Sequence, residues 1–175
     1  QSGRRQRQMC IRDRDISMVT MTQKPLKHGL KVALYQPDIP QNTASIIRTC
    51  SCLGASLEII EPCGFLFSDK RFKRVVMDYL DYSEIKFYKS PKEFFDENSK
   101  NRVVLMTTKA SKVYTKFKFK RNDILLFGRE SAGVPEDVHS KVNERIKIPM
   151  LKNKRSLNIS ISVAIGASEF IRQLG

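Results

Sequence analysis

Short apolar runs alternate with amphipathic stretches along most of the chain. The runs have the length of buried strands and occupy residues 31–35, 57–60, 85–88, 103–106, 124–127 and 145–148. Helix-like stretches lie between several of them, at residues 43–53, 69–80, 91–99, 135–142 and 157–174. This alternation predicts an α/β domain with a mainly parallel sheet and helices on both faces.

Residues 1–28 lack this pattern and differ in charge. Seven basic residues face two acidic ones there, and no apolar period develops. We therefore expect a disordered basic tail, either a presequence or a non-native extension, followed by a folded domain over residues 29–175. The domain keeps 25 basic and 16 acidic residues, a net charge of +9. Such a charge favours a polyanionic partner, with nucleic acid first.

Several functional classes find no support in the composition. The 175 residues contain no apolar run near the roughly 20 residues of a membrane-spanning helix. The four cysteines lack CxxC spacing, so we expect neither a disulfide framework nor a metal site, and a reducing, cytoplasmic setting. No GxG or GxxxxGK[ST] motif is present. His28 falls in the tail and His139 in a charged helix that we expect to be exposed, which leaves little basis for a His-dependent hydrolase.

Ligands of open parallel sheets bind beyond the carboxyl ends of the strands, and three segments in such positions carry functional side chains. In the first, Asn42 stands near a helix start and is expected to cap it. Arg48 is the lone charge of that helix-like stretch, which suggests a held, directional donor. In the second, residues 127–136, Gly128 and Gly133 let the backbone turn sharply or approach a ligand.

The third segment, residues 148–160, is a basic loop that leads into the last helix, with Ser156 as the expected N-cap. Residues 159–167 of that helix carry no charge on any side. A helix of this kind is normally buried all round. It lies either inside the domain or against a second subunit, and we favour a homodimer.

Each segment is a weak signal alone, but together they resemble the three signature motifs of the SPOUT RNA methyltransferases: Asn42-x5-Arg48, residues 127–136 and residues 156–160. The resemblance extends from about residue 30 to residue 175. Three further phrases are similar to a small branch of this family, which methylates the ribose 2′-oxygen of the wobble nucleotide, cytidine or uridine 34, in certain tRNAs: Ile59-Ile60-Glu61-Pro62, Asp69-Lys70-Arg71 and Thr107-Thr108-Lys109.

The resemblance implies a deep trefoil knot in the C-terminal part of the domain, S-adenosylmethionine as a cofactor bound in that knot, tRNA as substrate, and a homodimer through the last helix. It implies a cofactor pocket lined by Met106, Thr107, Gly128, Gly133, Ile148, Met150, Ser156 and Leu157. Without it, we would interpret Met106, Ile148 and Met150 as core residues. Apolar side chains with few polar groups do suit an adenine and a sulfonium methyl.

Methyl transfer to a hydroxyl depends on in-line placement of the reactants. The family's motif arginine, here Arg48, is often assigned as the base, but a guanidinium does not normally give up its proton in a protein. We expect Arg48 to orient the ribose or a phosphate and to stabilise the developing alkoxide. The resemblance implies four further catalytic residues and no metal: Asn42, Glu130, Ser156 and Asn158.

Two basic clusters flank the implied pocket, and we expect them to contact RNA phosphates: Lys70, Arg71, Lys73 and Arg74 form one, and Lys152, Lys154 and Arg155 the other. A charge run is more commonly a solvated face. A third basic stretch, residues 112–121, interleaves lysines with apolar residues. It is a weaker candidate for the same role, or else an edge strand whose lysines discourage aggregation.

Two other interpretations stay open. A non-catalytic RNA-binding domain with the same basic surface would not bind S-adenosylmethionine. A SPOUT enzyme acting on ribosomal RNA or on another tRNA position would usually carry an additional RNA-binding domain, whereas only the tail precedes the fold in this sequence. The minimal, wobble-nucleotide branch is therefore favoured.

Overall fold

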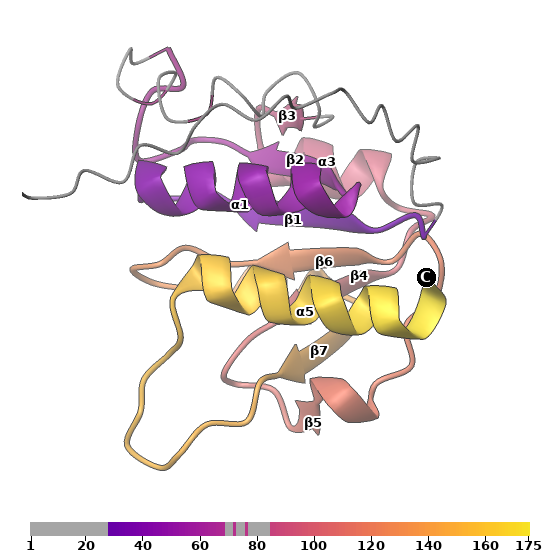
Figure 1. Ribbon diagram of the computed structural model, residues 1–175. Helices are drawn as coiled ribbons and strands as arrows, with labels where there is room; N and C mark the ends of the chain where they lie inside the picture. The colour runs from indigo at the N-terminus through magenta and orange to yellow at the C-terminus, as the bar shows by residue number, and fades with distance from the viewer. Residues whose placement is uncertain (1–27, 69–71, 73–75, 77–84) are drawn as a thin grey trace, which may run out of the picture.

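The structure is a computed structural model that describes residues 28–68, 72, 76 and 85–175. Within this part of the chain, seven strands form one sheet in the order β3-β2-β1-β6-β4-β7-β5, and neighbouring strands are parallel. The strands are β1 (Lys31–Tyr35), β2 (Ser56–Ile60), β3 (Ile85–Tyr88), β4 (Val103–Met106), β5 (Lys112–Val113), β6 (Ile124–Phe127) and β7 (Glu144–Lys147). Their carboxyl ends lie at one edge of the sheet (Figure 1).

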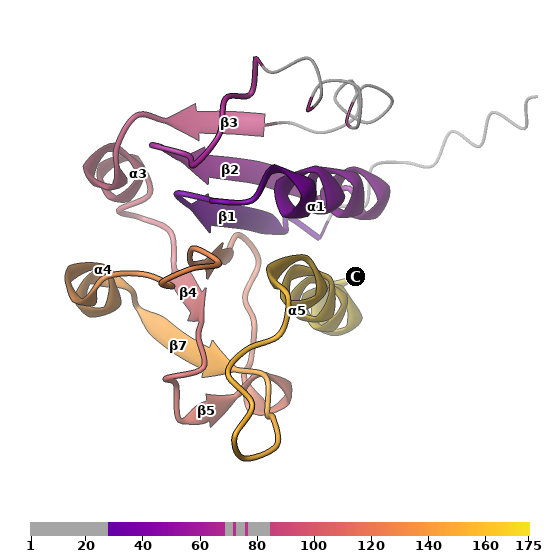
Figure 2. The same cartoon turned by 90° about the vertical axis from the view of Figure 1, so that its left-hand side faces the viewer.

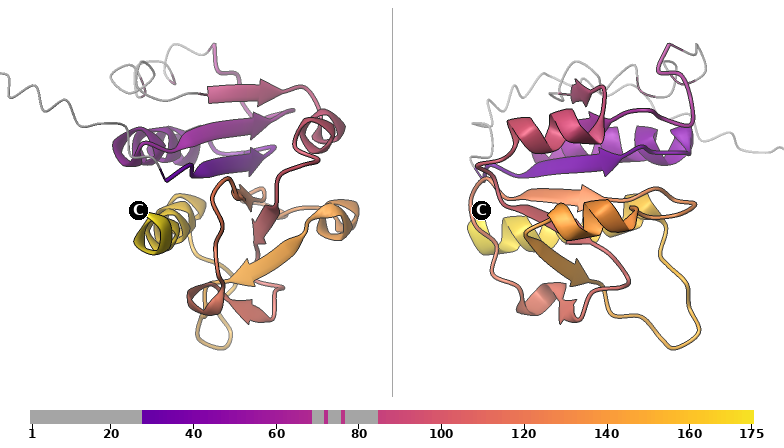
Figure 3. Two further views of the ribbon diagram at one scale, coloured as in Figure 1. Left: turned by 90° about the vertical axis from the view of Figure 1, so that its right-hand side faces the viewer. Right: turned by 180° about the vertical axis from the view of Figure 1, so that it is seen from behind.

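Helices cover both faces of this sheet (Figures 2 and 3). One face carries two long helices, α1 (Pro40–Leu53) and α5 (Ile159–Leu174). The other carries two short ones, α3 (Pro91–Glu97) and α4 (Glu136–Lys141). The α/β class, the parallel sheet and the two-sided helical cover predicted from the sequence are confirmed.

The central strands are buried on both faces, which explains their nearly continuous apolar sequence. In β1, Val32 and Leu34 belong to the core under α1 and α5, whereas Ala33 and Tyr35 belong to the core under α3 and α4. The two-residue period of a strand divides its side chains between these two cores. The sheet therefore gives a rigid frame whose carboxyl edge is free to hold loops.

The predicted elements match the observed ones closely. All six predicted strands are present, and β7 ends at Lys147, one residue earlier than expected. Helix α1 begins at Pro40 instead of at residue 43, because proline is well tolerated in the first helical turn. The helix predicted for residues 69–80 lies outside the described residues, apart from Phe72 and Val76.

His28, which the sequence placed in the tail, belongs to the fold. Its side chain is buried. The ring accepts a hydrogen bond from the amide of Leu30 through Nδ1 at 3.0 Å, and Nε2 donates to the carbonyl of Leu53 at 2.8 Å. These two bonds tie the residue before β1 to the end of α1.

Helix α5 is not buried all round within a single chain. Val163, Gly166 and Phe170 face the core, but Ile161 on the outer side is 52% exposed. The absence of charge from residues 159–167 therefore cannot be explained by burial inside the domain. The second alternative, burial against another subunit, is taken up below.

Candidate active site

A cavity of about 460 Å³ opens at the carboxyl ends of β4, β6 and β7. The loops that follow these three strands line it, together with the first turns of α1 and α5. Its volume lies in the range of small-molecule sites. All eight residues predicted to surround a cofactor lie in its wall: Met106, Thr107, Gly128, Gly133, Ile148, Met150, Ser156 and Leu157.

The loop after β6 is held by its own backbone. Arg129 and Gly133 exchange both of their N–H···O bonds, each at 2.9 Å. Gly133 has a φ of 69°, a left-handed value that favours glycine. A Cβ atom on Gly128 would lie 2.5 Å from the carbonyl carbon of Gly133. The first glycine is thus required by close backbone packing and the second by its conformation.

The Arg129 side chain ties this loop to the end of β1. Its Nη2 donates to Oε1 of Gln36, and Gln36 itself has a left-handed φ of 45°. The Nε of Arg129 is buried and has no hydrogen-bond partner within the described part of the chain. Arg129, which lines the cavity, therefore has an N–H donor at Nε that no described protein group satisfies.

Glu130 joins the same loop to α1 and, through α1, to α5. Its Oε2 accepts the amide of Asp38 at 2.9 Å, and its Oε1 accepts Nδ2 of Asn42 at 3.0 Å. The Oδ1 of Asn42 accepts Nδ2 of Asn158 at 2.9 Å. Three of the predicted catalytic residues, far apart in the sequence, thus form one hydrogen-bonded chain beside the cavity.

Asn42 is not the helix cap that the sequence suggested. The N-cap of α1 is Ile39, which makes no side-chain capping bond, because the helix already begins at Pro40. Asn42 therefore lies in the first turn, and its amide is engaged by Glu130 and Asn158 instead. Its role is to connect segments, not to start a helix.

Ser156 is likewise not the cap of the last helix. Asn158 takes that position, and its Oδ1 accepts the amide of Ser160 at 2.8 Å. An asparagine oxygen reaches the second amide of a helix well, whereas Ser156 remains two residues outside. Ser156 stays exposed in the cavity wall.

Met106 unites the two roles that the sequence left open. Its side chain is only 9% exposed and belongs to the core under α1 and α5, yet it also lines the cavity. Ile148 packs against the same core at half burial, whereas Leu157 is 40% exposed. The apolar wall thus runs from the core outward to the surface.

His139 is buried, which corrects the expectation that it is exposed, although the outer side of its helix is exposed as predicted. It is 5% exposed and lines the cavity from α4. Burial lowers the pKa of the imidazole, Lys109 and Arg145 lower it further, and Glu136 opposes them. The sequence misled because α4 has charged residues on its outer side, while Val138 and His139 turn inward.

Arg48 lies apart from the other predicted catalytic residues. Helical periodicity turns Ile46, Ile47 and Cys50 of α1 into the core, and Arg48 is exposed on the opposite side. It does not belong to the cavity wall among the described residues. The structure therefore brings four of the five predicted catalytic residues together and leaves Arg48 on the neighbouring surface.

The predicted RNA-binding residues divide into two groups. Lys152, Lys154 and Arg155 are exposed in the loop between β7 and α5, next to the cavity. The other group, Lys70, Arg71, Lys73 and Arg74, lies outside the described residues.

Sequence reasoning missed part of the cavity wall, including Thr108, Arg129, Val134 and His139. Val134 and Arg129 stand inside the 127–136 segment, so the segment itself was the available signal. His139 had no such signal, because nothing in its sequence neighbourhood showed that α4 packs beside the cavity.

The described part of the chain has neither a cluster of potential metal ligands nor a membrane-spanning helix. There, no three His, Cys, Asp or Glu residues gather as potential metal ligands, and no helix is long and apolar enough to span a bilayer. Cys50, Cys52 and Cys63 are free thiols. Burial raises the pKa of the Cys50 thiol to about 12, so this core cysteine behaves as a small apolar residue.

Comparison with known proteins gives consistent matches. The model of the SpoU rRNA Methylase family matches residues 29–168. A protein from Beijerinckia indica named tRNA (cytidine(34)-2'-O)-methyltransferase is 48% identical over 146 residues, which cover 82% of this chain and 91% of that protein. A protein of the same name from Escherichia coli K12 is 35% identical over 83% of this chain and 94% of its own length.

Solved structures agree with these sequence matches. One is described as giving insight into the 2-OH methylation of C/U34 on tRNA. It superimposes with a TM-score of 0.79 at 37% identity, over 83% of this chain and 95% of that one. The family match over residues 29–168 includes all three loops of the cavity.

Proposed function

Because the chain belongs to the SpoU rRNA methylase family, we propose that it transfers a methyl group from S-adenosylmethionine to the ribose 2′-hydroxyl of nucleotide 34, a cytidine or uridine, in tRNA. The observation that carries this proposal is the convergence of the 128–133 loop, the 148–158 loop and Asn42 on one cavity. The names of relatives that match over nearly their full length support the choice of tRNA over ribosomal RNA.

The cavity fits the cofactor in size and chemistry. Its volume of about 460 Å³ accommodates a nucleoside with an amino-acid side arm. Met106, Ile148, Met150 and Leu157 offer apolar surface for the adenine, and the backbone between Gly128 and Gly133 can approach without side-chain obstruction. The unsatisfied Nε of Arg129 offers a hydrogen-bond donor at the same wall.

The bound cofactor supplies an electrophilic methyl group on a sulfonium. The protein's own residues supply position. Glu130 uses its two oxygens to fix Asn42 and the chain at Asp38, so it acts as a positioning residue and not as a base. Asn42 and Asn158 present amide groups at the mouth of the cavity, where they orient the ribose. Ser156, exposed in the wall, adds a hydroxyl.

Arg48 serves the RNA from outside the cavity. Its exposed guanidinium on α1 orients the ribose or an adjacent phosphate while it stabilises the developing alkoxide. Replacement of Arg48 by Ala is expected to reduce turnover by about a hundredfold to a thousandfold, with the S-adenosylmethionine Kd nearly unchanged. An equal loss of cofactor binding, measured by calorimetry, would contradict this role.

The enzyme acts as a homodimer through α5. Three apolar side chains are well exposed near the starts of α1 and α5, namely Ile39 at 41%, Leu157 at 40% and Ile161 at 52%. A second copy that covers them would account for the absence of charge from residues 159–167 of α5. A trefoil knot is formed with the loops around residues 106–108, 128–133 and 148–157, as the family resemblance implies. The setting is the cytoplasm, in agreement with a tRNA substrate and the free cysteines.

Methyl transfer can be tested directly. The protein is incubated with labelled S-adenosylmethionine and total tRNA, and the position resistant to alkaline cleavage is mapped. The expected result is one 2′-O-methyl group at nucleotide 34. Binding of RNA without methyl transfer would refute the proposal and identify a non-catalytic RNA-binding domain. Label at another tRNA position, or in ribosomal RNA alone, would also refute it.

A further inference from the structure

Residues 116–121, here called the lysine strip, present a row of charges outside the active site. Lys116, Lys118 and Lys120 are exposed. The two residues between them, Phe117 and Phe119, are 4% and 5% exposed and pack against each other with ring centres 4.9 Å apart. The alternation thus points successive lysines outward from a buried aromatic anchor.

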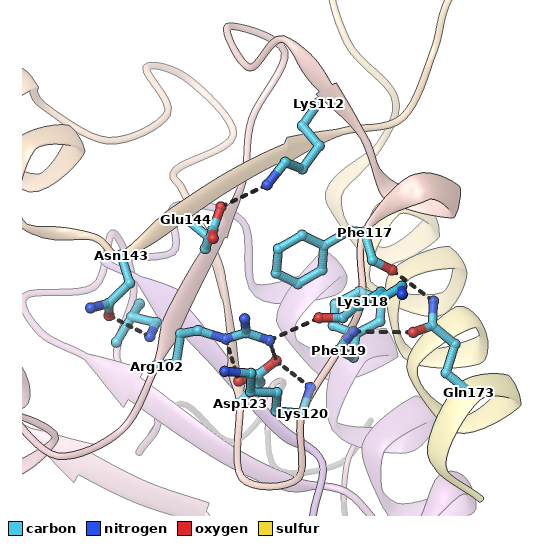
Figure 4. Close-up of polar contacts among 11 residues, drawn as sticks. Arg102, Lys112, Phe117, Lys118, Phe119, Lys120, Asp123, Asn143, Glu144 and Gln173 are labelled. Carbon is cyan, nitrogen blue, oxygen red and sulfur yellow. Dashed lines mark hydrogen bonds and ion pairs between the residues drawn. The ribbon is translucent and has the colours of Figure 1, made fainter.

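Side chains from three other elements fix the backbone of the strip (Figure 4). Gln173 of α5 accepts the amide of Phe119 at 3.1 Å and donates to the carbonyl of Phe117 at 3.0 Å. Arg102 donates to the carbonyl of Lys118 at 3.0 Å. Asp123 accepts the amide of Lys120 at 2.8 Å. The lysines are therefore displayed from an ordered support.

The edge strand considered for residues 112–121 is present only at Lys112–Val113, where β5 forms the edge of the sheet, and it does not explain the lysines of the strip. Strand β5 ends at Val113, and a 3-10 helix, η1 (Tyr114–Lys116), follows it. The backbone groups that an edge strand would leave open are occupied here by Gln173, Arg102 and Asp123. Lysines that protect no open edge need another explanation.

The acidic groups nearest to the strip are already paired. Asp123 forms a bidentate pair with Arg102, and Glu144 pairs with Lys112 at 3.1 Å. The carboxylate of Glu169 accepts both Arg172 and Gln173, and the hydrogen bond from Arg172 is the main reason that its pKa falls to about 2. Among the described residues, no ion pair involves Lys116, Lys118 or Lys120. Their charge is available to a partner.

The strip lies away from the cavity but is connected to its basic rim. Ile159, at the start of α5, lines the cavity, and Gln173 lies 14 residues further along the helix, or about 20 Å at 1.5 Å per residue. Val113, just before η1, pairs with Lys147, just before the loop that carries Lys152 and Lys154. The paired strands β5 and β7 thus connect the strip to the loop that carries Lys152 and Lys154.

We propose that the lysine strip binds the phosphate backbone of the substrate RNA at a position outside the methylated nucleotide. The proposal rests on the function proposed above, because it places the remainder of the same tRNA. Extended chains space alternate side chains at about 6.6 Å, which suits a repeating row of phosphates. A contact at this distance contributes to RNA affinity and not to the chemical step.

The test compares two triple variants. Lys116→Gln, Lys118→Gln and Lys120→Gln together remove three charges from the strip. The matched control, Lys89→Gln, Lys92→Gln and Lys100→Gln, removes three exposed charges outside the strip. Lys89 and Lys92 lie next to β3 and in α3, towards the opposite edge of the sheet, and Lys100 lies between α3 and β4. Because all six side chains are exposed, both variants should retain the melting temperature of the wild type.

The strip variant should raise the tRNA Kd by about tenfold or more near 0.1 M salt, and the slope of log Kd against log salt should fall by about 2. The kcat at saturating tRNA and the S-adenosylmethionine Kd should stay at wild-type values. An unchanged tRNA Kd, or an equal loss in the control, overturns the proposal. Failure of the wild type to methylate nucleotide 34 would refute the enzymatic function instead, whereas the strip is judged by RNA binding alone.

Discussion

The two long loops that line the cavity are held in opposite ways. The 128–133 loop is closed by the Arg129–Gly133 bridge and joined to α1 through Glu130. Within the 149–157 loop, by contrast, the described residues form one backbone hydrogen bond, from the amide of Lys154 to the carbonyl of Leu151 at 3.3 Å. Residues 151–157 of this loop are exposed.

This difference shows that the cavity has one wall that is preorganised and one wall that a ligand must complete. A loop with satisfied backbone groups holds its shape before binding, whereas an exposed loop with few bonds opens easily. The fixed wall belongs with the chemistry, because precise placement is what methyl transfer requires. The exposed wall is suited to close over cofactor and RNA.

The largest effect is expected at Gly128. An alanine there would place its Cβ 2.5 Å from backbone atoms of Gly133, so the loop must shift, and Gly128→Ala should cost about 3 kcal/mol of unfolding free energy. It should also abolish cofactor binding. Gly133→Ala is the matched control: its Cβ meets nothing within 4 Å, and only the positive φ costs about 1 kcal/mol. Equal losses in urea unfolding would show that the loop is not held by close packing.

A smaller effect is expected at Glu130. In Glu130→Gln the side-chain amide must face either the Asp38 amide or the Asn42 amide, both donors, at a cost of about 1–3 kcal/mol. Turnover should fall with stability, because Asn42 loses its orientation. Ser131→Ala, next to it, removes only the hydroxyl that donates to Oδ2 of Asp38 and leaves both bonds of Glu130 in place, so it serves as the control. Unchanged stability and kcat in Glu130→Gln would show that the hydrogen-bonded chain of Glu130, Asn42 and Asn158 does not contribute to catalysis.

The pH dependence of stability should report on His139, which lies under the fixed wall. Burial lowers its pKa, so below the ordinary histidine pKa of about 6.5 the unfolded state binds more protons than the folded one. Stability is therefore fully present above about pH 6.5 and is lost as pH falls below it. Between pH 7.5 and 5.5, the melting temperature should fall less steeply with decreasing pH for His139→Gln than for the wild type. Equal slopes for the two proteins would contradict this assignment.

The smallest effect on stability is expected in the exposed wall. Combined replacement of Lys152, Lys154 and Arg155 by Ala should change the unfolding free energy by less than about 0.5 kcal/mol. The same variant should weaken tRNA binding in a salt-dependent manner. A large loss of stability would show that this loop is as tightly held as the first, and the contrast between the walls would fail.

The sequence predicted the sheet well because its signals are local. Apolar runs such as 103–106 and 124–127 are buried on both faces and are readable without tertiary information. The pocket residues were found by resemblance, since Met106 looks like any core methionine. What remained hidden depends on contacts between distant segments: the burial of His139, the bond from Asn42 to Asn158, and the support of Phe119 by Gln173. No local pattern encodes such pairings.

Amide hydrogen exchange with and without S-adenosylmethionine tests the central claim most directly. Without cofactor, the amides of Arg129 and Gly133 should exchange slowly and those of residues 151–157 quickly. With cofactor, the 151–157 amides should become protected, while the Arg129 and Gly133 amides change little. Protection in neither loop would contradict a cofactor site between these walls, and slow exchange of both loops before addition would contradict their unequal preorganisation.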